Sequence, residues 1–316
     1  MVRVHPASAA ASALKYLGLV RKIDWGRATV LGVPYLWLIL FLLIPFLIIF
    51  KISVSEMQIS RIPFKDIVTY NDGVLNLSLK LGNYVFITQD PLYILTFISS
   101  LKFAFLTTLF CLLIGYPFAL CMARAKPEYR ATLMMLVILP FWTSFLLRIY
   151  AWKGILTSNG ILNNALMSFG VISEPLQIIN TPFSLTLGMV YAYLPFMIFP
   201  LYNNLVKQDH RLIEAAMDLG ATPWTAFWKV TFPLSMAGAL AGALLVFIPA
   251  VGEFVIPELL GGPDSLMIGR VLWDEMFSNN DWPMAASVAV VLILIVIVPF
   301  VILNHHQEKR GASGLA

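Results

Sequence analysis

The stretch Phe232-Pro-Leu-Ser-Met-Ala-Gly-Ala-Leu-Ala-Gly-Ala-Leu-Leu-Val-Phe-Ile-Pro-Ala-Val-Gly252 contains no charged residue. A helix that crosses the hydrocarbon core of a bilayer needs about 20 such residues, and only helices or closed barrels satisfy their backbone in lipid. Similar uncharged stretches occur at Ala28–Phe50, Phe103–Ala123, Ala131–Leu147, Leu185–Val206 and Pro283–Leu303. We therefore predict six transmembrane helices, the short third one continuing through Arg148 to about Trp152.

The composition agrees with a membrane protein. Of the 316 residues, 59% are apolar and 12% are charged, and the mean hydropathy is +0.82. Soluble domains are about 45–50% apolar and about 25% charged, so a water-soluble enzyme is excluded. The two cysteines, Cys111 and Cys121, lie in one apolar stretch and are expected to be small buried residues. We predict an all-α membrane protein.

The distribution of basic residues predicts the orientation. Counted over the non-membrane segments, 13 of the 21 Lys and Arg residues fall on the side of the two termini. The positive-inside rule then places both termini in the cytoplasm. The chain divides into a cytoplasmic tail at 1–27, a transmembrane domain at 28–303 and a second cytoplasmic tail at 304–316. The net charge of +4 reflects this orientation and does not predict binding of nucleic acid.

Two segments on the opposite, outer side have some expected structure. The segment from about Ile52 to Thr96 contains an alternating stretch at Leu75–Leu81 that predicts a small hairpin. The sequence Ile161–Phe169 predicts a short helix lying along the membrane surface.

No motif for catalysis or for cofactor binding is present. The sequence lacks a G-x-x-x-x-G-K-[ST] phosphate loop, an HExxH motif and a CxxC motif, and its four histidines lie in tails or loops. We predict that the chain is not an enzyme and holds no metal or cofactor. A partner protein or an ion gradient must therefore supply the energy for any uphill transport.

The segment 209–220, between the fourth and fifth predicted spans, has the signals of an amphipathic helix. Asp209 is placed to cap it, and Gly220 is placed to end it in a left-handed conformation. Thr222 and Pro223 are typical of the start of a following helix. The apolar positions recur at i, i+3, i+4 and i+7, namely Leu212, Ala215, Ala216 and Leu219.

Two functions are open for this helix. It could rest on the lipid surface, or it could dock onto a cytoplasmic protein. Glu214 and Asp218 place acidic charge on the face expected to lie opposite the apolar one. Anionic lipid of the inner leaflet repels such a face, so docking is favoured.

The residues Glu214-Ala215-Ala216, Gly220 and Val230-x-Phe232-Pro233 resemble the EAA signature of ABC-importer permeases. The family pattern has Ile and Leu where this chain has Val230 and Phe232. The resemblance implies a type I permease fold in a bacterial inner membrane. It also implies that helix 209–220 inserts into a cytoplasmic ATPase, with ATP and Mg bound by that partner. The implied coupling residues are Glu214, Ala215, Ala216, Asp218 and Gly220.

The resemblance also implies a heteromeric complex and a substrate class. The expected partners are a second permease subunit, an ATPase dimer, an extracytoplasmic substrate-binding protein and membrane lipid. The stretches Leu139–Phe145 and Phe247–Phe254, with Gly261-Gly262-Pro263, are similar to permeases of polyamine importers, most of all the putrescine-type subunit.

Glu253 is a candidate residue of the transport pathway. Placing an ionisable side chain at membrane depth costs free energy, so such residues usually serve a function. Polyamines carry ammonium groups on apolar chains, so carboxylates and aromatic rings suit them. Trp142, Tyr191 and Tyr193 are the aromatic candidates. Alternatively, Glu253 forms a structural ion pair with Arg270 or Arg148, and the aromatic residues only pack.

Two further interpretations remain open at this stage. A secondary transporter of a small organic cation, driven by an ion gradient, is the alternative function, although such proteins usually carry more intramembrane charges. Gly238 and Gly242 have the spacing that permits close packing of two helices. The helix of a second permease subunit is one candidate for the packing partner.

Overall fold

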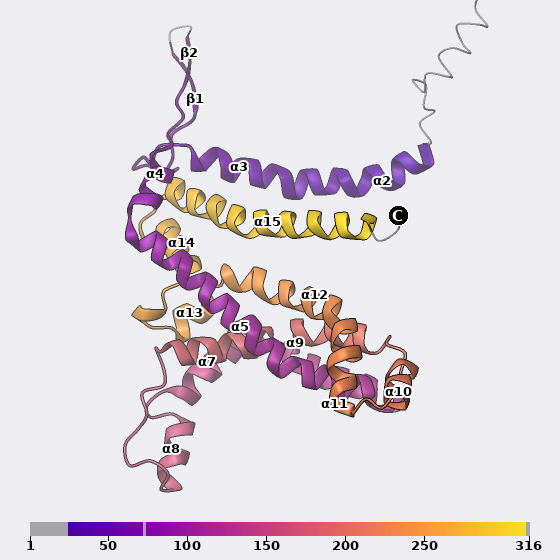
Figure 1. Ribbon diagram of the computed structural model, residues 1–316. Coiled ribbons are helices and arrows are strands. Elements are labelled where there is room, and N and C mark those ends of the chain that lie inside the picture. The colour runs from indigo at the N-terminus through magenta and orange to yellow at the C-terminus, as the bar shows by residue number, and fades with distance from the viewer. Residues whose placement is uncertain (1–24, 72–73, 314–316) are drawn as a thin grey trace, which may run out of the picture. The chain divides into compact units, whose positions relative to one another are not determined.

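The computed structural model describes residues 25–71 and 74–313 (Figure 1). It consists of two units, Met1–Ile52 and Ser53–Ala316, which are described separately. The predicted cytoplasmic tail at 1–27 lies almost entirely outside the described residues, as does the end of the tail at 304–316.

The first unit contains one long apolar helix. It begins as α2 (Trp25–Leu38), continues through the π-helical turn η1 (Ile39–Leu43) and ends with α3 (Ile44–Ser53). The 25 residues Thr29–Ser53 are long and apolar enough to span a membrane, and none in their most apolar window is buried. A helix that is apolar on all sides and exposed suits a lipid environment.

The outer segment of the second unit contains a hairpin and a short helix. Strand β1 (Val68–Asn71) pairs antiparallel with β2 (Val74–Leu77), and α4 (Gly82–Gln89) follows. The predicted hairpin is therefore present, but its second strand ends four residues earlier than Leu81. The amide of Lys80 donates instead to the carbonyl of Val54, which takes the chain out of the strand.

Three long helices form the centre of the second unit: α5 (Pro91–Arg124), α9 (Pro182–Leu205) and α12 (Phe232–Val251). Close approach is possible because small residues lie at the contacts. A Cβ added at Gly238 would lie 2.6 Å from the Cβ of Asn204, and one at Gly242 would lie 2.8 Å from the Sδ of Met197. The glycine pair thus packs α12 against α9 of the same chain rather than against a second permease.

The predicted third span is broken. The helix α6 (Pro127–Ile138) ends in the turn η2 (Leu139–Trp142), and α7 (Phe145–Leu156) follows. The bend between Pro127–Trp142 and Phe145–Ser168 is 84°. The expectation of one helix from Ala131 to Trp152 is therefore wrong. The backbone is extended at Thr143 and Ser144, and the Thr143 hydroxyl donates to the carbonyl of Pro140 at 2.7 Å. The proline and this local hydrogen bond favour a turn over a continued helix.

The remaining elements are shorter, except the last. They are α8 (Ile161–Ser168), α10 (Arg211–Asp218), α11 (Pro223–Ala226), η3 (Phe227–Thr231), α13 (Val255–Leu260), η4 (Pro263–Ser265), α14 (Ile268–Trp273), η5 (Asp274–Ser278) and α15 (Trp282–Ser313). The predicted surface helix at Ile161–Phe169 corresponds to α8. Cys111 is buried as expected, but Cys121 is exposed.

The fold is all-α apart from the hairpin, as predicted. Among the described residues, four helices are long and apolar enough to cross a membrane, or five if the bent pair counts as one span. A further apolar helix occupies Trp282–Val298 within α15. The exact number of six spans and the cytoplasmic position of both termini remain predictions.

Candidate functional site

The C-terminal end of α10 has the predicted geometry, whereas the N-terminal end differs by one residue. His210 is the N-cap and makes no side-chain cap hydrogen bond. Asp209 precedes it, and its Oδ1 atom accepts a hydrogen bond from the amide of Arg211 at 3.0 Å. Gly220 has a φ of 85°, in the left-handed region. The amide of Gly220 donates to the carbonyl of Met217, and the amide of Ala221 donates to the carbonyl of Ala216. These two bonds form a Schellman motif, which ends the helix at a fixed place.

The next helix begins directly after this turn. The Oγ1 atom of Thr222 accepts from the amide of Thr225, and Pro223 occupies the first turn of α11. Two helices of fixed length are thereby joined through only a few residues. The segment 209–226 is a stiff helix–turn–helix rather than a loose loop.

Helix α10 is exposed in the isolated chain. None of its residues is buried, and Leu219, just beyond its end, is 89% exposed. Leu212, Ala215 and Leu219 form an apolar stripe that no other part of the described chain covers. Asp218 is exposed as well. Such a stripe is a candidate surface for a partner protein.

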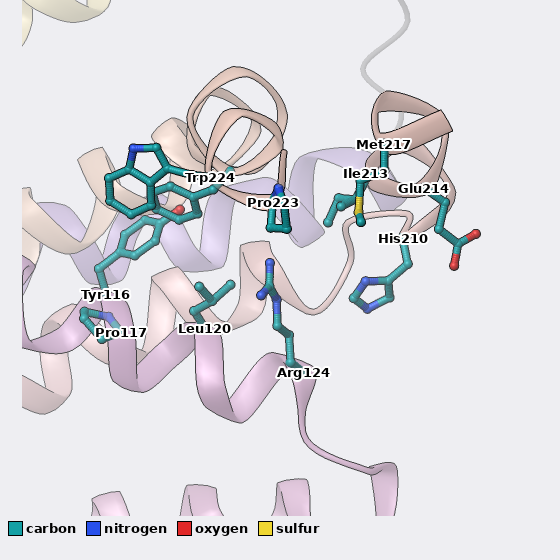
Figure 2. A pocket seen from close by; sticks show the side chains of 11 residues that line it. Tyr116, Pro117, Leu120, Arg124, His210, Ile213, Glu214, Met217, Pro223 and Trp224 are labelled. Atoms are coloured by element: carbon teal, nitrogen blue, oxygen red, sulfur yellow. The ribbon is translucent and has the colours of Figure 1, made fainter. Parts of the chain in front are cut away.

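Glu214 lies beside a pocket that Leu212, Ala215 and Leu219 do not line. It lines this pocket together with Ile213 and Met217, two apolar residues outside the predicted stripe. The pocket lies between α10, α11 and the end of α5, with a volume of about 650 Å³. Figure 2 shows Glu214 at the rim, with its carboxylate directed away from Arg124 of α5.

Aromatic residues connect the segment 209–226 to the long helices. The rings of Trp224 and Phe227 are stacked with centroids 6.0 Å apart, and Phe227 meets Tyr116 of α5 edge to face at 5.7 Å. The Tyr116 hydroxyl is hydrogen bonded to the Oγ of Ser235 in α12 at 2.7 Å. These contacts pack α11 and η3 closely against α5 and α12.

Glu253 lies in the turn between α12 and α13. Its Oε1 atom accepts hydrogen bonds from the amides of Phe254, Val255 and Ile256, at 3.2, 3.0 and 3.4 Å. Its Oε2 atom accepts a hydrogen bond from the Tyr193 hydroxyl of α9. The carboxylate thus caps the N-terminus of α13, where the helix dipole favours a negative charge.

Neither arginine that the sequence offered as an ion-pair partner fills that role. The Nε of Arg270 lies 2.8 Å from a carboxylate oxygen of Glu258 and 4.0 Å from one of Asp274. The guanidinium of Arg148 lies over the ring of Phe141, 4.6 Å from its centroid. The ion-pair interpretation of Glu253 is therefore wrong, and backbone amides with one tyrosine satisfy the group instead.

Only one of the three aromatic candidates contacts Glu253. Tyr193 is buried and donates to it, whereas Tyr191 points elsewhere and meets Trp152 of α7 edge to face at 5.4 Å. Residues two apart on a helix lie on nearly opposite sides, which explains the difference. Trp142 is 72% exposed at the end of η2.

Two aromatic residues near Tyr193 were not predicted. Phe196 lies one turn further along α9, with its ring centroid 6.2 Å from that of Tyr193. Phe141 meets Phe196 edge to face at 5.6 Å. The i, i+3 spacing of Tyr193 and Phe196 could have indicated the first neighbour, but nothing local in the sequence indicates Phe141.

Within the part of the chain that the structure describes, no group of three or more His, Cys, Asp or Glu residues could hold a metal ion. The geometry thus consists of an exposed helix–turn–helix, three closely packed long helices and one carboxylate held at a helix break.

Residues 115–311 match the family of binding-protein-dependent transport system inner membrane components. The chain belongs to this family: it is a multi-pass inner-membrane permease of an ABC importer and not an enzyme. It is 40% identical over 271 residues to the spermidine/putrescine transport system permease protein PotB of Haemophilus influenzae, covering 85% of this chain and 90% of that protein.

The fold has solved relatives as well. It resembles a chain of a bacterial ABC transporter involved in the import of the acidic polysaccharide alginate, with a TM-score of 0.66 and 16% identity over 95% of this chain and 99% of that chain. The structure of a bacterial alginate transporter in complex with a pentasaccharide-bound periplasmic protein gives the same TM-score at 17% identity, over 91% and 96% of the two chains. These likenesses agree with the type I importer permease fold.

Proposed function

We propose that this permease forms the pathway for polyamines such as putrescine. The observation that carries the proposal is the 40% identity, over most of both chains, to a protein named for spermidine and putrescine transport. The candidate pathway residues are Glu253 and Tyr193, with Trp142 and Tyr191 as aromatic surfaces further away. A carboxylate beside aromatic rings suits an ammonium group on a methylene chain.

We further propose that α10 is the coupling helix and that a cytoplasmic ATPase dimer binds it. The proposed contacts are Glu214, Ala215, Ala216, Asp218 and Gly220. The exposed stripe of α10 and its fixed end at Gly220 support this role. ATP and Mg belong to the ATPase in this proposal. A second permease subunit and an extracytoplasmic binding protein complete the complex, and the related alginate transporter was solved with a periplasmic protein.

We infer a path of coupling that runs along α12. Helix α12 continues directly from η3 and has Glu253 just beyond its other end, about 30 Å away at 1.5 Å per residue. In this proposal α12 carries a displacement of η3 to the turn at its other end. Closure of the ATPase at α10 would therefore shift the turn that holds Glu253, and with it the hydrogen bond to Tyr193.

The experiment that tests the substrate is uptake by the complete complex in proteoliposomes. We expect transport of labelled putrescine that depends on internal ATP and on the binding protein. An excess of unlabelled 1-aminobutane or 1-butanol should inhibit this transport only weakly. A secondary transporter, the disfavoured alternative, would instead stop when the ion gradient is collapsed. No uptake of polyamines, or polyamine uptake that continues without ATP, would overturn the proposal.

The experiment that tests docking is a charge reversal at Glu214 with a matched control. Glu214→Lys is expected to reduce co-purification of the ATPase or the uptake per ATP hydrolysed. Glu174→Lys reverses an exposed acid outside this segment and should change neither. Normal association and normal uptake of Glu214→Lys would remove the docking role.

A further inference from the structure

An apolar groove runs along the outside of the helix pair α5 and α9. Its volume is about 390 Å³, and it is separate from the coupling segment and from Glu253. On α5 the lining residues recur every four positions, and on α9 they recur every three to four. The α5 side consists of Lys102, Phe103, Leu106, Phe110 and Ile114, and the α9 side of Pro182, Phe183, Thr186, Leu187 and Val190.

The groove is parallel to the two helices. The thiol of Cys111 donates to the carbonyl of Val190 at 3.6 Å, and a Cβ at Gly115 would lie 3.2 Å from Met197. These contacts place later residues of α5 level with later residues of α9, so the helices run in the same direction. Lys102 and Pro182 therefore lie at one end of the groove, and Ile114 lies at the other.

The dimensions match one leaflet of a bilayer. From Lys102 to Ile114 the groove extends about 18 Å at 1.5 Å per residue. The hydrocarbon core of a bilayer is about 30 Å thick, so one leaflet contributes about half of that. Lys102 is about 33 Å along α5 from Arg124, which places these two cations near opposite boundaries of the hydrocarbon.

The lining is apolar except at the end with Lys102. The hydroxyl of Thr186 donates to the carbonyl of Pro182 at 2.8 Å, which leaves its methyl group for the groove. The ammonium of Lys102 is exposed and lies 5.6 Å from the ring centroid of Phe103. Among the residues that the structure describes, no carboxylate forms an ion pair with Lys102.

We propose that this groove binds an anionic phospholipid of the outer leaflet, with one acyl chain between α5 and α9 and its phosphate at Lys102. An apolar channel as deep as one leaflet suits a lipid tail, and a cation without an acidic partner at its interfacial end suits an anionic headgroup. A helix of a partner protein would bury Lys102, or it would need a carboxylate opposite Lys102. Such a helix is the competing occupant, and the test distinguishes it from a lipid.

The test uses the complete importer in nanodiscs containing equal amounts of phosphatidylglycerol and phosphatidylcholine with identical acyl chains. Native mass spectrometry of the released complex counts the lipids that stay bound. We expect one retained lipid with about a fivefold preference for phosphatidylglycerol, the factor for one lysine near an anionic headgroup. Lys102→Ala should abolish the preference, and Lys102→Arg should keep it.

Two matched controls keep the result specific. Lys153→Ala removes another exposed lysine and should leave the preference unchanged. Thr186→Trp fills the groove and should remove the bound lipid, whereas Leu113→Trp enlarges an exposed residue of α5 outside the groove and should not. Equal preference in wild type and Lys102→Ala, or a helix of the second permease seated in the groove in a structure of the complex, would overturn the proposal.

Discussion

Replacing Glu253 by Gln separates the charge of this residue from its role as a helix cap. Glutamine keeps an oxygen for the amides of Val255 and its neighbours, which the carboxylate now binds at 3.0 to 3.4 Å. The Tyr193 hydroxyl can turn from donating to accepting. The lost attraction to the N-terminus of α13 is worth about 0.3–1 kcal/mol, small beside a typical stability of about 5–15 kcal/mol. The complex should therefore still assemble.

The expected effect on transport is larger. A carboxylate that attracts a diammonium substrate at reduced dielectric is expected to lower the barrier by about 1–2 kcal/mol. Each 1.4 kcal/mol is a factor of ten in rate, so polyamine uptake by Glu253→Gln should fall about tenfold. Hydrolysis of ATP stimulated by the binding protein should fall less, because the coupling segment at α10 is unchanged.

The assay compares initial uptake rates in proteoliposomes with the yield of assembled complex. Glu258→Gln is the matched control, since Glu258 is an exposed carboxylate of the adjoining helix α13 and pairs with Arg270. Tyr193→Phe keeps the charge of Glu253 and removes only its hydroxyl partner, so uptake should fall less than in Glu253→Gln. Wild-type uptake by Glu253→Gln, or loss of the complex itself, would refute the pathway assignment.

Three other predictions concern the turn of α10, the helix contacts and the outer segment. Gly220→Ala places a Cβ at a φ of 85°, which costs about 1–2 kcal/mol, and uptake per ATP hydrolysed should fall while Gly220→Asn is tolerated better. Gly238→Ala would bring a Cβ within 2.6 Å of Asn204, and the melting temperature in detergent should fall by several degrees, in contrast to an unchanged value for the exposed Gly154→Ala. Hydrogen bonds from Lys80 and Lys65 lower the pKa of Glu56 to about 2. Because the folded-state pKa is below the unfolded value, the stabilisation is present above about pH 4.5 and is lost as the pH falls toward 2. The carboxyl resonance of ¹³C-labelled Glu56 should therefore titrate with a midpoint near 2, and an ordinary midpoint near 4 would contradict the Lys contacts.

The sequence alone determined the features that depend on local interactions. Apolar length predicts membrane helices because the bilayer thickness is fixed, and this holds for Pro182–Leu205 and Phe232–Val251. The ends of α10 were also predictable to within one residue, since Asp209 and Gly220 act through hydrogen bonds to residues at most five positions away. The EAA pattern gave the family because its residues stand at fixed spacing in one short segment.

Only the tertiary structure decided which distant groups meet. Glu253 is 60 residues from Tyr193, and the sequence offered an arginine only as one possible partner, whereas the fold brings a tyrosine and three backbone amides to it. Gly238 faces Asn204 of the same chain for the same reason, because the direction in which α12 presents its small residues depends on how it packs against α9. Hydrophobic periodicity is weak in helices that are apolar on most sides, so it does not specify which face meets a neighbour and which meets lipid.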